Sequence, residues 1–511
     1  MKKKFLTILA SLILMVPLLL QSAFSVKTVY ADGTSSDSVN VTLHKRVFDS
    51  MPTKKQNTGS LMSDFGGTGL NGVTFKAYNV TDHYLSLRKA GSSAQDAVNA
   101  IQADAKDSDN LPSYASSAID TQKTATANGE DGIATFSNLN LKSSDGKYQT
   151  YLFVETDSPT DITQQAEPVV LTMPIYNKSD DAQTSDINHD VQIYPKNVKS
   201  TPITKDLDDA SKKSLAVTLP DGTKVYNAAY GDTFGYQVTV NVPWNIKDKD
   251  TFNVVDKPEK GIQVDASTVA VAGLTKGTDY NVVAQDNGYK VTFDTTKAAV
   301  RALAGKSLTI AYKATLTSDA APDTAIGNTA TLNIGNGTNI TSTPASGPDI
   351  YTGGANFVKE DAQSSQVLAG AEFQLVKVDS NGSIVSYATQ AADGSYTWNS
   401  SATNATTYTS NGDGLVQVKG LPYSAKLAAG QSYALVETKA PAGYAKLDTP
   451  VKFTITKGSF ADAQKIKIDN TKQGILPSTG GKGILIFVVV GLALMIGALI
   501  WYRKVKKNPE I

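Results

Sequence analysis

The stretch Tyr151-Leu152-Phe153-Val154-Glu155-Thr156 decides the fold of the region around it, and it returns late in the chain as Tyr433-Ala434-Leu435-Val436-Glu437-Thr438. Each copy lies the same number of residues after an Asp-Gly pair, whose glycines are Gly132 and Gly414. A further pair of matching blocks is Leu70 to Phe75 and Leu368 to Phe373. Because the blocks recur in the same order, the first and last domains are predicted to share one fold.

The pattern between these blocks is that of β-strands. Short alternating runs of Val, Ile, Thr, Tyr and Phe are separated by Gly, Asn, Asp and Pro, which is typical of β-sandwich domains in tandem. One exception is Ala94 to Ala105, where Ala97, Val98 and Ile101 recur at helical spacing and predict a helical insertion in the first domain. The segment from Ser200 to Pro348 lacks the blocks and is predicted to form a separate β domain.

Both ends of the chain predict export. Three lysines precede the apolar run Phe5 to Leu20, and Val29-Tyr30-Ala31 offers the small residues that a signal peptidase reads, so cleavage before Asp32 is expected. Near the other end, the uncharged run Ile484 to Trp501 is just long enough for a membrane helix. The basic tail that follows should remain in the cytoplasm, which leaves the bulk of the chain outside.

Composition excludes several classes of protein. The 48 basic residues balance 48 acidic ones, which argues against nucleic-acid binding. The chain has no cysteine, so disulfides cannot stabilise it outside the cell. There is no zinc-binding His or Cys pattern, calcium loop, serine nucleophile elbow or phosphate-binding glycine loop. We therefore predict no metal, no cofactor and no enzyme that turns over a substrate.

The residues before the apolar run carry a specific signal. The pentapeptide Leu476-Pro477-Ser478-Thr479-Gly480, the membrane stop and the basic tail together resemble the cell-wall sorting signal that sortases read in Gram-positive bacteria. The resemblance implies that a sortase cysteine attacks the carbonyl of Thr479, releases Gly480 onward, and passes the acyl group to an amine. The alternative is a permanent anchor with a single membrane span.

Strand alternation places charged residues in the predicted cores. Residues i and i+2 share a face of a strand, so Glu155 lies in line with Phe153, and Glu437 with Leu435. The same rule places a lysine near the start of each domain, and an asparagine near its end, among apolar residues. The resulting sets of lysine, acid and asparagine are Lys45, Glu155 and Asn197; Lys205, Asp232 and Asn328; and Lys359, Glu437 and Asn470.

These sets suggest a self-directed reaction. In a site of low dielectric constant the lysine amine loses its proton and the carboxyl keeps its own, so a neutral nucleophile meets a polarised amide. Attack on the asparagine carbonyl with loss of ammonia would give a Lys–Asn isopeptide bond between the first and last strands of each domain. The alternatives are that each lysine forms a salt bridge with its acid, or that it lies solvated on an edge strand.

At this point the chain resembles a known family, the three-domain backbone pilins of sortase-assembled Gram-positive pili. The stretch Tyr433 to Tyr444, YALVETKAPAGY, looks like the E-box of that family, and Ile193-Tyr194-Pro195-Lys196-Asn197 looks like its pilin motif. By the resemblance, the Lys196 amine receives the Thr479 acyl group of the next subunit. Along this strand Lys196 alternates with residues that are predicted to face inward, so its side chain is also predicted to face solvent.

The resemblance implies a mainly β fold of tandem immunoglobulin-like sandwiches, CNA-B-like in the first and last domains and CNA-A/B-like in the middle one. The implied partners are identical pilin subunits, a pilus-specific and a housekeeping sortase, minor pilins and peptidoglycan, with a host surface ligand left open. The expected segments are a signal peptide (1–31), an N-terminal domain (32–199), a middle domain (200–349), a C-terminal domain (350–473) and a sorting signal with its helix and tail (474–511).

Two classes of function remain open from the sequence. The first is a structural subunit of the pilus shaft, in which Lys196 of one subunit is joined to Thr479 of the next. The second is a monomeric surface adhesin, or a minor pilin at the tip or base, that is attached directly to the cell wall. Whether Lys196 is used separates the two. A wall-anchored hydrolase is a third class, but no catalytic constellation supports it.

Overall fold

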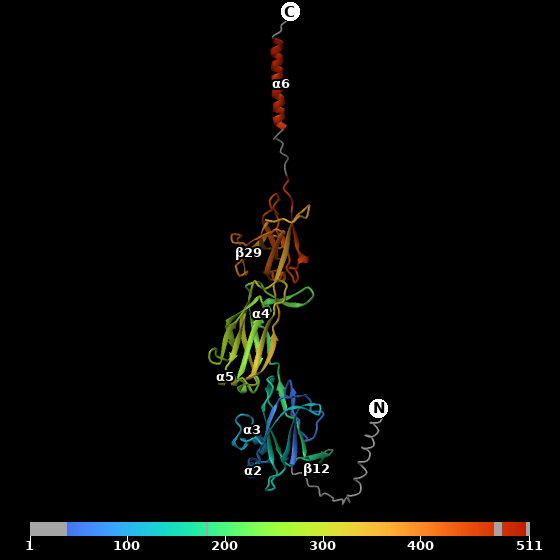
Figure 1. Cartoon of the computed structure of the whole chain (residues 1–511), viewed down its shortest axis with the longest axis vertical. Coiled ribbons are helices and arrows are strands. Elements are labelled where there is room, and N and C mark those ends of the chain that lie inside the picture. Colours follow the sequence, from blue (N-terminus) through green and yellow to red (C-terminus); the bar gives the residue numbers. More distant parts are fainter. Residues whose placement is uncertain (1–37, 180–181, 475–482, 507–511) are drawn as a thin grey trace, which may run out of the picture. The chain divides into compact units, whose positions relative to one another are not determined.

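The computed structural model of the chain describes residues 38–179, 182–474 and 483–506 (Figure 1). The signal peptide and the pentapeptide Leu476 to Gly480 lie outside the described residues. The chain divides into two compact units, and residues up to Thr201, 241–246 and 304–306 belong to the first. Strands form most of both units and a few small helices accompany them, which confirms the mainly β class.

The first unit contains three four-stranded sheets and one two-stranded sheet. Their strand orders are β13-β1-β7-β6, β10-β8-β4-β5, β3-β2-β14-β9 and β11-β12. The strands are β1 (Ser38–His44), β2 (Arg46–Phe48), β3 (Thr68–Gly69), β4 (Thr74–Asn79), β5 (Asp120–Lys123), β6 (Ala125–Ala127), β7 (Glu130–Asn140), β8 (Thr150–Asp157), β9 (Ile162–Gln164), β10 (Val169–Thr172), β11 (Tyr176–Ser179), β12 (Ala182–Ile187), β13 (Asp190–Ile193) and β14 (Lys196–Lys199).

Residues 151–154 of strand β8 are all apolar because this part of the strand is covered on both faces. Tyr151 and Phe153 belong to the main core of the unit. Leu152 and Val154 face the other way, into a second cluster that includes Ile101 and Ala105. A strand that alternates between two buried faces reads as a continuous apolar run. This double burial explains the composition of the stretch that contains Glu155.

Helical residues pack against the second face of β8. Helices α2 (Thr81–Lys89), α3 (Ala94–Asp104) and η1 (Ser113–Ala115) lie between β4 and β5. Ser93 caps α3 by accepting a hydrogen bond from the Asp96 amide at 3.1 Å, and Ala97 and Ile101 are its buried residues. The helical insertion predicted over 94–105 is confirmed. Helix α2 was missed because Thr81 is its one fully buried residue, so its sequence has only a weak apolar face.

The second unit includes most of what we call the middle segment, residues 203–351, of which 241–246 and 304–306 belong to the first unit. Its sheets have the orders β15-β18-β23-β20, β21-β22-β19-β24-β25 and β16-β17-β26. Their strands are β15 (Ile203–Leu207), β16 (Ala216–Thr218), β17 (Lys224–Asn227), β18 (Thr233–Asn241), β19 (Thr251–Pro258), β20 (Ile262–Val271), β21 (Tyr280–Gln285), β22 (Gly288–Phe293), β23 (Ser307–Leu316), β24 (Asn328–Asn336), β25 (Asn339–Ser346) and β26 (Ile350–Tyr351). Short helices are α4 (Asp209–Leu215), η2 (Ile246–Asp248) and α5 (Ala298–Arg301).

The C-terminal segment, residues 353–470, packs two sheets around one core. The sheets have the orders β32-β27-β35 and β30-β29-β28-β33-β34, and β31 also pairs with β28. The strands are β27 (Gly353–Asp361), β28 (Glu372–Val378), β29 (Ile384–Gln390), β30 (Tyr396–Asn399), β31 (Thr407–Thr409), β32 (Leu415–Leu421), β33 (Ser432–Lys439), β34 (Val451–Phe453) and β35 (Ile466–Asn470). Short turns of helix are η3 (Ser424–Lys426) and η4 (Asp462–Gln464).

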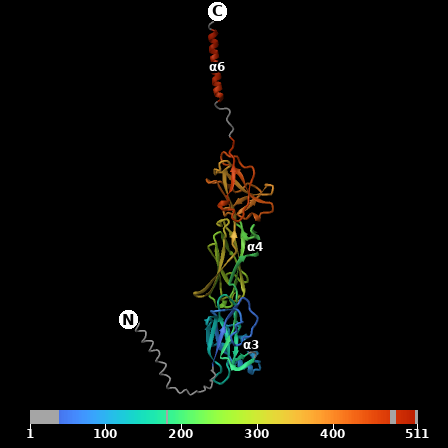
Figure 2. The ribbon, with the colours of Figure 1, turned by 90° about the vertical axis from the view of Figure 1, so that its right-hand side faces the viewer.

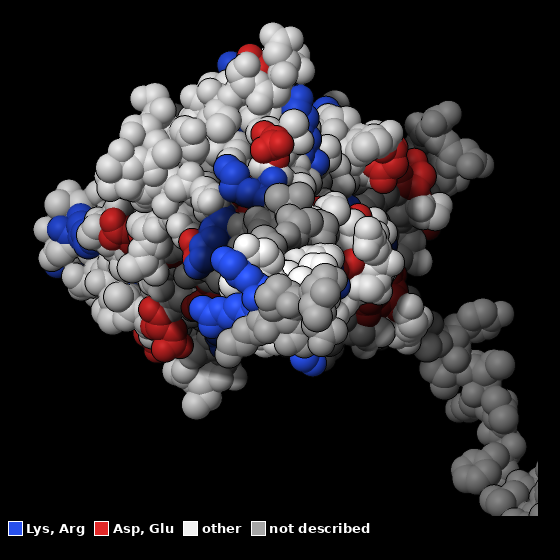
Figure 3. Space-filling view, turned by 90° about the horizontal axis from the view of Figure 1, so that it is seen from above, with Lys and Arg blue, Asp and Glu red and all other residues white. Residues whose placement is uncertain are grey.

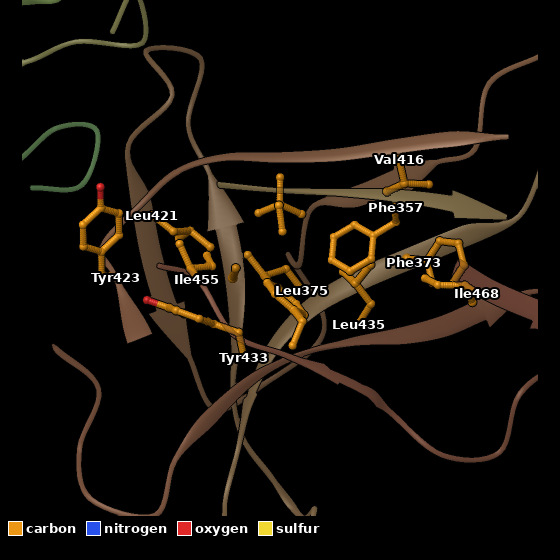
Figure 4. Close-up of a cluster of buried hydrophobic side chains, with 14 of the residues drawn as sticks. Phe357, Phe373, Leu375, Val416, Leu421, Tyr423, Tyr433, Leu435, Ile455 and Ile468 are labelled. Atoms are coloured by element: carbon orange, nitrogen blue, oxygen red, sulfur yellow. The ribbon is translucent and has the colours of Figure 1, made fainter. Parts of the chain in front are cut away.

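Strand β33 carries the second copy of the repeated stretch. Figure 4 shows Tyr433 and Leu435 of β33 in the same apolar cluster as Phe357 of β27 and Phe373 of β28. Glu437 lies on the same strand two residues further on and is 1% exposed. Strand alternation therefore predicted the burial of the Glu437 carboxyl correctly.

Helix α6 (Gly483–Lys506) follows the C-terminal segment (Figures 1 and 2). Residues Leu485–Lys506 are long and apolar enough to cross a membrane, and they are not buried within the protein. Arg503, Lys504 and Lys506 end the helix, as a positively charged cytoplasmic flank requires. Seen from above, acidic and basic side chains both appear on the surface (Figure 3).

Candidate cross-link sites

The first unit brings Lys45, Glu155 and Asn197 into mutual contact. Lys45 Nζ donates to Glu155 Oε2 at 2.7 Å and to Asn197 Oδ1 at 2.5 Å. Asn197 Nδ2 donates to Glu155 Oε1 at 2.8 Å, which closes the triangle. The three residues are at most 2% exposed. The sequence-predicted set is thus one cluster in which an amine, a carboxyl and an amide touch inside an apolar core.

The surroundings of this cluster favour an uncharged amine. Burial lowers the pKa of Lys45, and the nearby Glu155 carboxylate acts in the opposite direction. The amine also lies 5.2 Å from the centre of the Phe75 ring. Glu155 Oε2 accepts a further hydrogen bond from the Ala166 amide at 3.0 Å, which fixes the carboxyl in place. A nucleophile and a held acid therefore share one dry site.

The C-terminal segment places its lysine in an equivalent register. In β2 and β14, which are parallel, Val47 lies opposite Asn197, so Lys45 precedes the partner of the asparagine by two residues. In β27 and β35, also parallel, Asp361 lies opposite Asn470, and Lys359 again precedes it by two. Two residues along a strand restore the same face. The repeated fold thus repeats the placement of lysine and asparagine.

Contacts in the C-terminal site are less complete. Asn470 Nδ2 donates to Glu437 Oε2 at 3.0 Å, while Lys359 Nζ donates to the Ile468 carbonyl at 2.7 Å. Lys359 and Asn470 are both 0% exposed. Burial lowers the pKa of Lys359 to about 8, against the opposing effect of the Glu437 and Asp469 charges. Acid and amide therefore touch, and the amine lies on the neighbouring strand without a hydrogen bond to either.

In the middle segment, the prediction that Asp232 is the core acid is wrong. Asp232 is exposed and accepts a hydrogen bond from the Ala229 amide at 2.8 Å, so it is not the core acid. Strand β18 begins only at Thr233, and Asp232 belongs to the turn before it, where alternation no longer applies. The acid beside Lys205 is Asp256, which is 2% exposed.

Strand alternation could have identified Asp256 from the sequence. It alternates with Phe252 and Val254 along β19, and all three are buried. Burial lowers the pKa of Lys205 to about 8, and Asp256 acts in the opposite direction. Asn328 opens β24 and is completely buried, although β25 and β26 follow it, so it is not on the last strand.

Lys196 lies at the start of β14, beside the buried Asn197. Its side chain is half-buried, so the predicted exposure is only partial. Burial, and then the charge of Lys54, lower the pKa of Lys196. The amine lies 5.7 Å from the centre of the Phe65 ring, and Phe65 stacks on Tyr194 with ring centroids 4.6 Å apart. Phe65 therefore contacts both Lys196 and Tyr194, which lies two residues before that lysine.

A groove adjoins Lys196 on the same unit. Its volume is about 570 Å³, and Met51, Tyr176 and Pro195 are among its lining residues together with Lys196. The acyl donor predicted for Lys196, Thr479, lies outside the described residues.

Within residues 38–179, 182–474 and 483–506, no group of three His, Asp or Glu side chains is arranged to hold an ion. His44, the most buried histidine, contacts Gln192 at 2.7 Å and Glu130 at 3.1 Å. It stacks on Tyr194 with ring centroids 4.7 Å apart. These contacts make His44 a packing residue beside the Lys196 region.

Comparisons with known proteins match three parts of the chain. Residues 36–198 match the family described as Gram-positive pilin subunit D1, N-terminal domain. Residues 353–472 match the SpaA prealbumin-like fold domain, and residues 468–508 match the LPXTG cell wall anchor motif. The fimbrial subunit type 2 of Actinomyces naeslundii is 26% identical over 520 residues, which cover 92% of this chain and 91% of that protein.

Solved structures give the same result for the fold. The RrgB pilus protein from Streptococcus pneumoniae superposes with a TM-score of 0.52 at 16% identity, over 87% of this chain and 100% of that one. The major pilin SpaD from Corynebacterium diphtheriae is 25% identical over 86% of this chain and 98% of that one, with a TM-score of 0.43. The matches to the pilin D1 family, the SpaA domain and the LPXTG anchor motif assign the chain to the class of pilus proteins anchored to the cell wall.

Within that class the chain is a Gram-positive pilin, with a pilin D1 domain, a SpaA prealbumin-like domain and an LPXTG anchor. It is a structural protein, and the anchor motif with the hydrophobic helix α6 locates it at the cell wall. The resemblance drawn from the E-box and the pilin motif is confirmed at this level.

Proposed function

We propose that this pilin forms the covalent shaft of the pilus by linking Lys196 of each subunit to Thr479 of the next. The support is the position of the Lys196 amine, which is half-buried beside an aromatic ring on the rim of a groove. A lowered pKa increases the fraction of neutral amine, which is the nucleophilic form. Thr479 stands in Leu476-Pro477-Ser478-Thr479-Gly480, where a sortase would cut.

The joining reaction has two steps. A sortase cysteine attacks the Thr479 carbonyl, the bond to Gly480 breaks, and the segment from Gly480 onward leaves with a protonated amino terminus. The Lys196 amine of another subunit then attacks the thioester, an amide forms, and the cysteine thiol leaves. Helix α6 is released in the first step, so it serves as a temporary anchor. The final subunit passes to peptidoglycan by the same chemistry.

We also propose that each of three domains is closed by a Lys–Asn isopeptide bond, with domains at 32–199, 200–349 and 350–473. The bonds join Lys45 to Asn197, Lys205 to Asn328 and Lys359 to Asn470, and the acids are Glu155, Asp256 and Glu437. The observation that carries this proposal is the buried triangle of Lys45, Glu155 and Asn197, with contacts of 2.5 to 2.8 Å.

Internal bonds suit the mechanical role of a shaft. In the first and last domains the lysine lies near the strand by which the chain enters, and the asparagine lies near the strand by which it leaves. A covalent bond between these neighbouring strands carries tension past the rest of the domain. Hydrogen bonds between parallel strands would otherwise bear that load alone.

The test of the shaft is an immunoblot of boiled cell-wall extracts. Wild type should give a ladder of polymers, and Lys196→Ala should give folded monomer without a ladder. Lys199→Ala is the matched control, because Lys199 is exposed on the same strand and should leave the ladder intact. A ladder that persists in Lys196→Ala would contradict the linkage, and a single band in wild type would indicate a monomeric adhesin or minor pilin.

A further inference from the structure

The middle site differs from the other two in how its acid reaches its amide. Tyr312 of β23 lies between them: its hydroxyl donates to Asp256 Oδ2 at 2.7 Å. Asn328 Nδ2 donates to the same hydroxyl at 3.1 Å. Lys205 Nζ also donates to Asp256 Oδ2. The order of contacts is therefore lysine, aspartate, tyrosine and asparagine.

The other sites have no such intermediate. Asn197 Nδ2 donates directly to Glu155 at 2.8 Å, and Asn470 Nδ2 donates directly to Glu437 at 3.0 Å. Glutamate has one methylene more than aspartate. In the middle site the shorter acid and the tyrosine hydroxyl together span the distance that glutamate spans alone.

We propose that Tyr312 is a catalytic residue of the middle cross-link, which relays a proton from Asp256 to the departing nitrogen of Asn328. This inference rests on the proposed isopeptide chemistry and adds a residue to it. Tyr312 qualifies because its hydroxyl touches Nδ2, the atom that must leave as ammonia. An amide nitrogen is a poor leaving group unless it takes up a proton.

Four proton transfers make up the relay. The Lys205 ammonium gives one proton to Asp256, and the neutral amine attacks Cγ of Asn328. Tyr312 donates its proton to Nδ2 and regains one from Asp256, so both of its hydrogen bonds reverse direction. The Cγ–Nδ2 bond breaks and ammonia leaves. The attacking nitrogen then gives its extra proton to the Asp256 carboxylate, which leaves a secondary amide and a neutral acid.

The environment of Tyr312 suits a relay. The residue is 2% exposed, and burial together with the Asp256 charge holds its pKa well above the usual value, so the hydroxyl keeps its proton between transfers. The centres of the Tyr312 and Tyr236 rings lie 5.6 Å and 4.9 Å from Lys205 Nζ, and the two rings stack on each other with centroids 5.6 Å apart. These rings confine the amine next to the acid.

Neighbouring tyrosines provide a comparison within the same core. Tyr236 and Tyr289 are also buried, but their hydroxyls have no hydrogen-bond partner among the residues that the structure describes. Tyr289 packs against the Tyr312 ring with centroids 4.9 Å apart. Only Tyr312, within this group, bridges the acid and the amide, so the hydroxyl rather than the aromatic ring distinguishes it.

The test compares Tyr312→Phe with Tyr289→Phe in the full chain. Each chain is synthesised in a cell-free system, and the cross-linked peptide that joins Lys205 to Asn328 is followed over time by mass spectrometry. Tyr312→Phe should slow its appearance by about 100-fold or more, the usual contribution of a general acid. Tyr289→Phe should form it at the wild-type rate. The other two cross-links serve as internal controls for folding and digestion.

Two further chains keep the outcomes distinct. Asp256→Glu in the Tyr312→Phe chain should restore the bond, because a longer acid reaches the amide directly. Tyr312→Phe placed in a Lys205→Arg chain, which cannot form the bond, measures any change in melting temperature that the hydroxyl causes through packing alone. A wild-type rate in Tyr312→Phe would overturn the relay. Absence of the peptide from wild type would instead overturn the middle isopeptide bond itself.

Discussion

Replacing Asn197 by alanine removes the electrophile from the first site and leaves the Lys45–Glu155 pair in place. The reacting residues lie 152 positions apart, so their bond closes a long loop. By analogy with a disulfide, closing such a loop stabilises the folded domain by about 5 kcal/mol through the entropy of the unfolded chain. Loss of the buried amide contacts adds about 1 to 3 kcal/mol.

These free energies convert into a measurable shift in melting temperature. A domain of this size melts about 2 to 4 °C lower for each kcal/mol lost, so the cross-link alone is worth roughly 10 to 20 °C. Differential scanning calorimetry of the full chain should show one transition displaced by this amount and the others nearly unchanged. Intact-mass spectrometry of the same sample should show one ammonia fewer lost.

The matched control is Asn188→Ala. Asn188 is 7% exposed and donates to the Gly59 carbonyl at 2.8 Å, so it is a buried, hydrogen-bonded asparagine without a lysine partner. Its replacement should cost only the hydrogen-bond contribution. If Asn197→Ala lowers the melting temperature no more than Asn188→Ala, the triangle is a salt bridge with an amide beside it, and the reasoning is refuted.

Three further outcomes follow from the sites. Asp256→Ala should abolish the Lys205–Asn328 peptide in a tryptic map, whereas Asp232→Ala should retain it; the reverse result would reinstate Asp232 as the acid. Glu437→Gln should abolish the Lys359–Asn470 peptide, while Glu372→Gln, at a more exposed acid paired with Lys439 at 2.7 Å, should not; equal yields in both chains would exclude a role for Glu437. Because the proposed reaction keeps the lysine proton within the site, on the acid, bond formation should be level just below pH 8 and should slow about tenfold per pH unit above it, where the pKa values of about 8 for Lys205 and Lys359 let that proton leave to solvent, as timed peptide maps across pH would reveal; a rate that instead rises tenfold per pH unit up to pH 8 would show that the acid does not need the proton.

Strand periodicity predicted much of the site because the reacting groups are buried on regular strands. Glu155, Lys359 and Glu437 share a face with apolar neighbours, and all are at most 2% exposed. The rule failed at Asp232 because a sequence does not mark the residue at which a strand begins. One position outside β18 is enough to turn the side chain to solvent.

The remaining features depend on contacts between strands that are distant in sequence. Asp256 obeys the same alternation as the correct residues, but Tyr312 reaches it from another sheet, and no periodicity links the two. Helix α2 escaped detection for a different reason, since its apolar side is narrow. The register of Lys45 and Lys359 also needs the parallel pairing of first and last strands, which composition does not specify.

The central claim is the covalent joint between subunits, and its most direct test is a peptide map of purified pilus polymer. The digest should contain a branched peptide in which the Lys196 amine carries the Thr479 carbonyl, and no peptide from Gly480 onward. A polymer in which Lys196 is unmodified, or in which Thr479 is joined to a different lysine, would contradict the account.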